Sequence, residues 1–145
     1  MQVCGVDLSS GMVTQARRLN PGIEFHQSDM FGLDLPNESF AGITAFYAIV
    51  NLPRESLVRA FRELHRILKP HGLLLLAFHL GQENLRKEEM FGIPVSLDFI
   101  LFGRDEMCDY LRTAGFDIRE VIERDPYPEV EHPTRRAYIF ARKIA

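Results

Sequence analysis

The stretch RESLVRAFRELHRILKPHGLLLLAF, residues 54–78, decides the fold class of this chain. Its apolar residues first recur at the spacing of one helical face: Leu57, Phe61, Leu64 and Leu68. This spacing predicts a helix over residues 54–68. Pro70 cannot continue that helix, and the four leucines that follow predict a strand over residues 73–78 with both faces covered. A helix that leads directly into a buried strand is typical of an α/β domain.

The rest of the chain alternates strand-like and helix-like segments with short connections. We expect further strands over residues 3–8, 23–27, 41–50, 116–123 and 136–143, and further helices over residues 10–19 and 104–114. Residues 81–102 have a weaker pattern, and we interpret them as an insertion with a short helix, or as a lid. The order of the segments predicts an α/β fold with a Rossmann-like, mostly parallel sheet flanked by helices, in a single domain over residues 1–145.

The composition is that of a soluble globular protein, because 46% of the 145 residues are hydrophobic, 26% are charged and the formal net charge is −3. The basic residues are spread along the chain, so the sequence does not indicate a nucleic-acid partner. No apolar run approaches the roughly 18–20 residues that cross a bilayer, and the N-terminus has no signal pattern. We therefore expect a cytoplasmic protein without membrane contact, in which Cys4 and Cys108 are free, buried thiols.

Three motifs occur at successive strand boundaries. They are GVDLS at residues 5–9, QSDM at residues 27–30 and LHRILKPHG at residues 64–72. Together with AGF and RAYIFAR near the end of the chain, they resemble the strand regions of class I S-adenosylmethionine-dependent methyltransferases. The resemblance covers nearly the whole chain apart from residues 81–102. It implies methyl transfer from S-adenosylmethionine to a small-molecule acceptor.

The resemblance also implies a cofactor site at the carboxyl ends of the strands, where ligands bind in open α/β sheets. Asp7 would accept hydrogen bonds from the ribose hydroxyls, and Leu8 would pack on the adenine. Asp29 would accept from the adenine amino group, Met30 would line the ring and Phe46 would touch the cofactor. From the residues alone, Asp7 is more often a helix cap or dipole partner. A solvated turn is the alternative for Asp29, and a plain core position is the alternative for Phe46.

The sequence identifies no catalytic residue. Residues 46–54 would form the substrate side, but Asn51 stands where similar proteins often have a histidine. Tyr47 is a candidate for orienting a substrate, although a structural tyrosine is the favoured interpretation. The five histidines have no metal-ligand spacing, so we expect no metal site and assign none of them to catalysis. His71 stands where the family commonly has a glycine in the turn after the helix.

Members of this family begin with a strand and a glycine-rich turn that hold the methionine half of the cofactor. This chain starts in what resembles the family's second strand, so we expect it to be N-terminally incomplete and inactive by itself. We also expect an exposed sheet edge through which copies of the chain could associate.

Two other classes of protein fit part of the pattern. A nicotinamide-dependent oxidoreductase also binds a ribose with an acid at a strand end. A non-catalytic Rossmann-like module that acts with a partner chain also fits. The Lys-Pro-His-Gly turn at residues 69–72 and the final pair of strands favour the methyltransferase.

Overall fold

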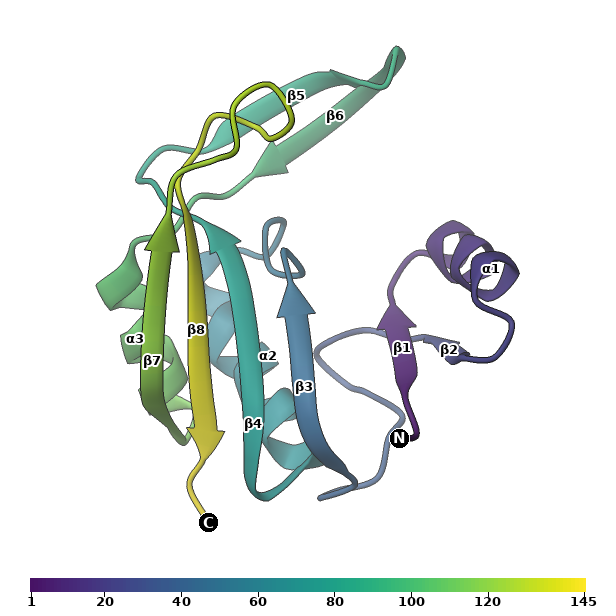
Figure 1. Ribbon diagram of the computed structural model, residues 1–145, viewed down its shortest axis with the longest axis vertical. Helices are drawn as coiled ribbons and strands as arrows, with labels where there is room; N and C mark the ends of the chain where they lie inside the picture. The colour runs from purple at the N-terminus through teal and green to yellow at the C-terminus, as the bar shows by residue number, and fades with distance from the viewer. The chain divides into compact units, whose positions relative to one another are not determined.

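The four leucines at residues 73–76 lie in β4 (Leu68–His79), an inner strand of a four-stranded sheet in a computed structural model that describes residues 1–145 (Figure 1). The strand order is β3-β4-β8-β7, with β3 (Phe40–Phe46), β7 (Phe116–Arg124) and β8 (Arg136–Lys143). β3 runs parallel to β4, whereas β8 runs antiparallel to both β4 and β7. The strands expected over residues 41–50 and 73–78 are therefore neighbours in one sheet, and the last strand is antiparallel to its neighbours.

Two helices cover one face of this sheet, α2 (Leu57–Ile67) and α3 (Arg104–Thr113) (Figure 1). The core between them and the sheet is fully buried: Leu57, Phe61, Leu74, Leu76, Phe78, Met107 and Leu111. The predicted helix over residues 54–68 is confirmed in its body, although its first turn is the 3₁₀ helix η1 (Arg54–Ser56). The expectation that the leucine run is covered on both faces is wrong, because the side chain of Leu73 is 52% exposed.

The chain divides into two compact units, Met1–Pro36 and Asn37–Ala145. The first contains β1 (Cys4–Asp7), α1 (Ser10–Leu19) and β2 (Glu24–Gln27), and β1 pairs with β2 in parallel. Ser9 caps α1, since its side-chain oxygen accepts from the backbone N–H of Met12 at 3.3 Å. β1 pairs only with β2, and β3 pairs only with β4. One edge of each of these two strands therefore has no strand partner.

β3 is shorter than predicted. It ends at Phe46 because Tyr47 adopts a left-handed backbone conformation with φ 53°, which extended strands do not contain. The backbone N–H of Tyr47 still donates to the carbonyl of Ala77 at 2.9 Å. Ile49 and Val50, although apolar, are buried in the turn that follows rather than in the strand.

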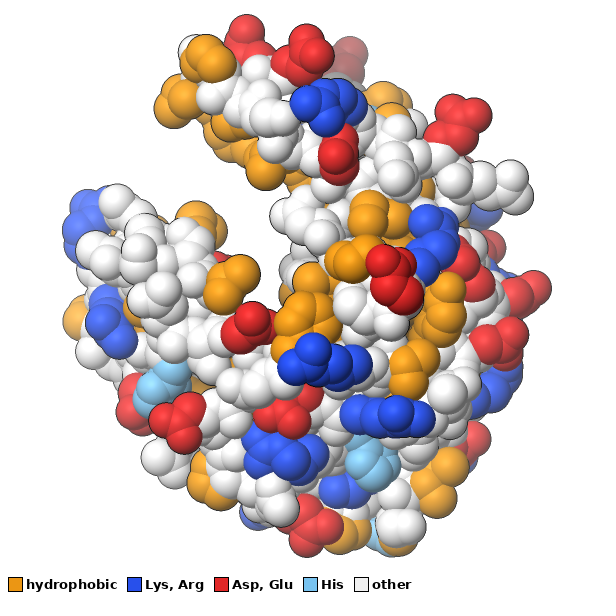
Figure 2. All heavy atoms as spheres, turned by 180° about the vertical axis from the view of Figure 1, so that it is seen from behind, with side chains coloured by type: hydrophobic (Ala, Val, Ile, Leu, Met, Phe, Trp, Pro, Cys, Tyr) orange, Lys and Arg blue, Asp and Glu red, His pale blue; other side chains and the backbone are white.

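The expectation of a short helix within residues 81–102 is also wrong. These residues form an antiparallel hairpin of β5 (Leu85–Met90) and β6 (Ile93–Phe99). Phe91 and Gly92 connect the strands with φ 55° and 77°, as in the two-residue turns that match the twist of a hairpin. Phe91 is 96% exposed, and Figure 2 shows hydrophobic side chains gathered at the end of this hairpin. None of the helices in the structure is both long enough and apolar enough to span a membrane.

Gly115 ends α3, as the sequence predicts. Its φ is 100°, and a Cβ added there would lie 2.9 Å from Nε2 of His65. We expect Gly115→Ala to lower the free energy of unfolding by about 2 kcal/mol or more, since it adds both backbone strain and a steric clash. Urea titration followed by circular dichroism measures this change.

Gly92 provides the matched control. Its φ of 77° is also left-handed, but no atom lies within 4 Å of an added Cβ. Gly92→Ala should therefore cost only the backbone strain, at most about 1–2 kcal/mol. If Gly115→Ala and Gly92→Ala lose the same free energy of unfolding, the clash with His65 contributes nothing to the loss.

Candidate functional site

Two acidic side chains lie at the carboxyl end of the parallel pair β1–β2. Asp7 is the last residue of β1, and Asp29 follows the end of β2 by two residues. Because Asp7 lies opposite Gln27 in the parallel register, both acids stand at the same end of this small sheet. Both side chains are exposed.

Each of these acids uses one carboxylate oxygen to close its own turn. Oδ1 of Asp7 accepts from the N–H of Ser9 at 2.8 Å, and Oδ1 of Asp29 accepts from the N–H of Phe31 at 2.9 Å. The helix cap is Ser9, so Asp7 does not have the capping role. Oδ2 of Asp7 and Oδ2 of Asp29 make no hydrogen bond within the chain, and both can accept from the hydroxyl or amino group of a ligand.

Of the other residues expected to bind the cofactor, two follow the acids directly in the sequence, and the third, Phe46, does not. Leu8 is 67% exposed, and its carbonyl accepts from the side chain of Gln27 at 3.2 Å. Met30 is half-buried. Phe46 lies in the second unit, at the end of β3, with its side chain 55% exposed. That Phe46 faces the same cleft as the two acids stays a prediction.

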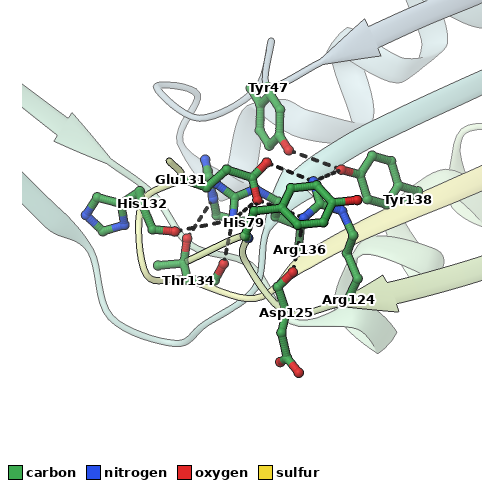
Figure 3. A network of polar contacts seen from close by, with 10 residues as sticks. Tyr47, His79, Arg124, Asp125, Glu131, His132, Thr134, Arg136 and Tyr138 are labelled. Carbon is green, nitrogen blue, oxygen red and sulfur yellow. Dashed lines mark hydrogen bonds and ion pairs between the residues drawn. The ribbon is translucent and has the colours of Figure 1, made fainter. Parts of the chain in front are cut away.

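A second cluster of polar side chains lies at the carboxyl ends of β3 and β4 (Figure 3). We call it the strand-end network, and it comprises Tyr47, His79, Arg124, Glu131, Thr134, Arg136 and Tyr138. The pairing of the strands assembles it, because His79 at the end of β4 lies opposite Arg136 at the start of β8. Tyr138 lies opposite Ala77, which accepts the backbone hydrogen bond of Tyr47.

Two arginines in this network share a single carboxylate. Arg124 binds Glu131 through two hydrogen bonds of 2.8 and 2.9 Å, and a guanidinium nitrogen of Arg136 lies 3.4 Å from the same carboxylate. The hydrogen bonds from Arg124 lower the pKa of the Glu131 carboxyl to about 2. The side chain of Arg136 is nearly fully buried, and one of its terminal nitrogens donates to the carbonyls of His132 and Thr134. Its Nε is buried without any hydrogen-bond acceptor.

The aromatic side chains lie beside these charges. The ring of Tyr47 stacks on that of His79, with centroids 4.7 Å apart, and its hydroxyl lies 3.5 Å from the hydroxyl of Tyr138. Arg124 donates to the Tyr138 hydroxyl at 2.9 Å. Nδ1 of His79 bonds to the Thr134 hydroxyl at 2.8 Å, and its Nε2 has no hydrogen-bond partner. Burial, followed by the charge of Arg136, lowers the pKa of His79, whereas burial raises the pKa of Tyr47.

The sequence did not reveal this network. His79 is the last residue of its strand, as Asp7 is, and this position at a strand end was the signal that the sequence offered. The spacing of the histidines fits no metal site and so gives no signal for His79. In the structure, no three His, Cys, Asp or Glu side chains gather as metal ligands. Arg136 and Tyr138 come from the other end of the chain, and only the pairing of β8 with β4 brings them to His79.

The fold is similar to that of solved methyltransferase structures. A SAM-dependent methyltransferase from Methanosarcina mazei matches 99% of this chain and 82% of its own, with a TM-score of 0.87 at 16% identity. The 1,6-didemethyltoxoflavin-N1-methyltransferase of Burkholderia thailandensis, solved with 1,6-didemethyltoxoflavin and S-adenosylhomocysteine, matches 99% of the chain and 62% of its own, with a TM-score of 0.74 at 18% identity. The [4+2]-cyclase SpnF has a TM-score of 0.73 at 20% identity, over 100% of this chain and 68% of its own. The fold is thus that of class I S-adenosylmethionine-dependent methyltransferases.

The sequence comparisons agree with the fold. Residues 1–72 match a family described as "Methyltransferase domain". A demethylmenaquinone methyltransferase of Chlorobaculum parvum is 37% identical over 71 residues, which are 49% of this chain and 29% of that protein. A phosphoethanolamine N-methyltransferase of Plasmodium falciparum is 26% identical over 125 residues, 83% of this chain and 46% of that protein. The first half of the chain is therefore similar in sequence to methyltransferase domains, and the chain spans less than half the length of these relatives.

The ion pair of Glu131 predicts a pH dependence of stability. Its pKa is about 2 in the folded chain and near 4.5 when unperturbed, so the ionised carboxylate stabilises the fold fully above about pH 5. This stabilisation is lost as the pH falls from there toward 2, because the unfolded chain takes up the proton first. The difference in the free energy of unfolding between wild type and Glu131→Gln should be constant near neutral pH and shrink in acid.

Glu129 lies in the same loop without an ion pair or a side-chain hydrogen bond, so Glu129→Gln is the matched control. Urea titrations at a series of pH values compare the three proteins. If the free energy of unfolding of Glu131→Gln differs from that of the wild type by the same amount at neutral and acidic pH, Arg124 does not stabilise the carboxylate.

Proposed function

We propose that this chain is part of an enzyme that transfers a methyl group from S-adenosylmethionine to a small-molecule acceptor, with both units acting as one domain. The unpaired carboxylate oxygens of Asp7 and Asp29, at the strand ends of a methyltransferase fold, are the observation that carries this proposal. Relatives named for demethylmenaquinone, phosphoethanolamine and sterol methylation support a small acceptor, but not one particular acceptor.

The residues of the first unit fit the adenosine part of the cofactor. Oδ2 of Asp7 can accept from the ribose hydroxyls, and Oδ2 of Asp29 can accept from the adenine amino group, in charge-assisted hydrogen bonds. Leu8 and Met30 are proposed to contact the adenine through their apolar side chains, with Leu8 packed on the ring and Met30 lining it. Phe46 is proposed to contact the cofactor from the second unit.

When bound, the cofactor supplies a methyl group on a positively charged sulfur. The transfer needs little covalent chemistry from the protein, and its rate depends chiefly on holding the acceptor atom in line with the methyl carbon. The proposed contribution of this chain is therefore to bind and orient the two reactants.

The role of Asp7 can be tested without disturbing its turn. Asp7→Asn keeps an oxygen that accepts from the N–H of Ser9 but removes the charge. Each charge-assisted hydrogen bond is worth about 1.5–3 kcal/mol, so the variant should bind S-adenosylhomocysteine at least about tenfold more weakly. Titration of ¹⁵N-labelled protein followed by NMR detects weak binding, with Asp34→Asn as an exposed acidic control. Unchanged affinity in Asp7→Asn would contradict the proposed ribose contact.

We further propose that the polypeptide 1–145 by itself binds S-adenosylmethionine weakly and catalyses no turnover. Within these residues Gly5, the one glycine before Asp7, lies inside β1 and forms no turn that could hold the methionine end of the cofactor. Each lost contact of about 1.4 kcal/mol costs tenfold in affinity. The free edges of β1 and β3 should also promote self-association, since β3 has no charged residue along its length. Ultracentrifugation with labelled cofactor tests both statements, and micromolar binding by a clean monomer would contradict them.

A further inference from the structure

We propose that the strand-end network is the acceptor site, and that Nε2 of His79 takes the proton from a hydroxyl group of the acceptor. This inference rests on the proposed methyl transfer and names the substrate side of the same reaction. The acceptor class that fits is a phenol or an enol, which reacts through its oxyanion.

The position of the network is the first argument. Tyr47 and His79 stand at the carboxyl ends of two adjacent parallel strands, the edge at which open α/β sheets bind ligands. Tyr47 holds a left-handed backbone conformation at this edge, which is unfavourable for an aromatic residue. Such conformations cluster at functional sites. Tyr47, His79 and Tyr138 are each only half-buried, so a ligand can reach their polar atoms.

The charge of the network is the second argument. Two guanidinium groups, of Arg124 and Arg136, face one carboxylate, that of Glu131, which leaves an excess of positive charge. Nε of Arg136 is buried and has no acceptor, although unsatisfied buried donors are rare and costly. The hydroxyls of Tyr47 and Tyr138 lie 3.5 Å apart, so one can donate to the other while the second donates to a ligand. These groups favour an electron-rich or anionic oxygen and disfavour a cationic amine.

His79 is the group in the network that can accept a proton. Its Nδ1 is held by the Thr134 hydroxyl, and its Nε2 is unoccupied. The groups that face it are Tyr47 from the end of β3, Arg136 from β8, and Glu131 and His132 from the loop before β8. Burial and the charge of Arg136 lower the pKa of His79, which keeps its imidazole neutral at pH 7.

The proposed step balances. The O–H bond of the acceptor breaks, its proton moves to Nε2 of His79, and its electron pair stays on the oxygen. The acceptor oxygen then forms the bond to the methyl carbon, and the electron pair of the broken carbon–sulfur bond remains on sulfur. The imidazolium of His79 returns its proton to water after the product leaves.

The test uses 4-nitrophenol as a probe, because its phenolate is yellow and its phenol form is not. At a pH below the pKa of free nitrophenol, adding the protein should generate the phenolate colour, because the charges of Arg124 and Arg136 stabilise the phenolate while His79 takes the proton. His79→Gln should abolish the colour and weaken binding about three- to tenfold, as the loss of one hydrogen bond predicts. Tyr138→Phe should weaken binding by a similar factor. His71→Asn is the matched control, since His71 is exposed at the opposite end of β4 and asparagine tolerates its φ of 63°.

A second readout is the ¹⁵N spectrum of His79. Nε2 should be the unprotonated nitrogen in the free protein and should gain a proton when nitrophenol binds. Failure of nitrophenol to bind, colour that persists in His79→Gln, or a proton on Nε2 in the free protein would each overturn the inference. Titration of the same samples with S-adenosylhomocysteine separates the two proposals. If S-adenosylhomocysteine binds but nitrophenol does not, only the proposed acceptor site is rejected. If nitrophenol binds but S-adenosylhomocysteine does not, the proposed methyl transfer is rejected.

Discussion

The strand β4 is hydrogen-bonded along both of its edges, to β3 on one side and to β8 on the other. Its alternate residues Leu74, Leu76 and Phe78 are fully buried, which fixes their face of the strand against the helices. A slip of one residue would turn these side chains to the opposite face, so the register is strongly determined. The same register places Tyr47 and Arg136 beside His79, and the polar site is therefore a consequence of the apolar core.

The loop before β8 is held by the polar groups that it also helps to position. Glu131 accepts from both nitrogens of Arg124 and from the backbone N–H of Tyr127 at 2.8 Å. The carbonyls of His132 and Thr134 in turn satisfy one nitrogen of the buried Arg136. Most of the network thus has a structural role. Nε of Arg136 and Nε2 of His79 take no part in it, and these two atoms carry the functional argument.

The sequence predicted the elements whose signals are local. The helical spacing of Leu57, Phe61 and Leu64 predicted α2, and the run of leucines predicted the second half of β4, which begins five residues earlier at Leu68. The end of β3 was missed because Ile49 and Val50 are as apolar as strand residues, while a backbone reversal at Tyr47 places them in a buried turn. The hairpin was missed because an irregularity between Lys87 and Glu89 interrupts its alternation.

The two candidate sites differ in what the sequence could say about them. Asp7 ends one strand and Asp29 follows the next, each within a short motif, so the family resemblance pointed to both as residues of one site. The strand-end network joins residue 47 to residue 138, and no local pattern connects positions so far apart. These residues come together only because β8 pairs with β4 and β3 pairs with β4, which is a property of the whole four-stranded sheet.

The fold by itself does not determine the chemistry, since the [4+2]-cyclase SpnF shares it over the full length of this chain. The side chains at the strand ends must therefore carry the distinction. In this chain they fall into two groups of opposite character. The first unit presents acids with open acceptor oxygens, which suit the hydroxyl and amino donors of a nucleoside. The second presents arginines, phenols and a neutral histidine, which suit an electron-rich oxygen that must lose a proton. A single ligand would not need both, so the division of charge between the two units argues for two reactants.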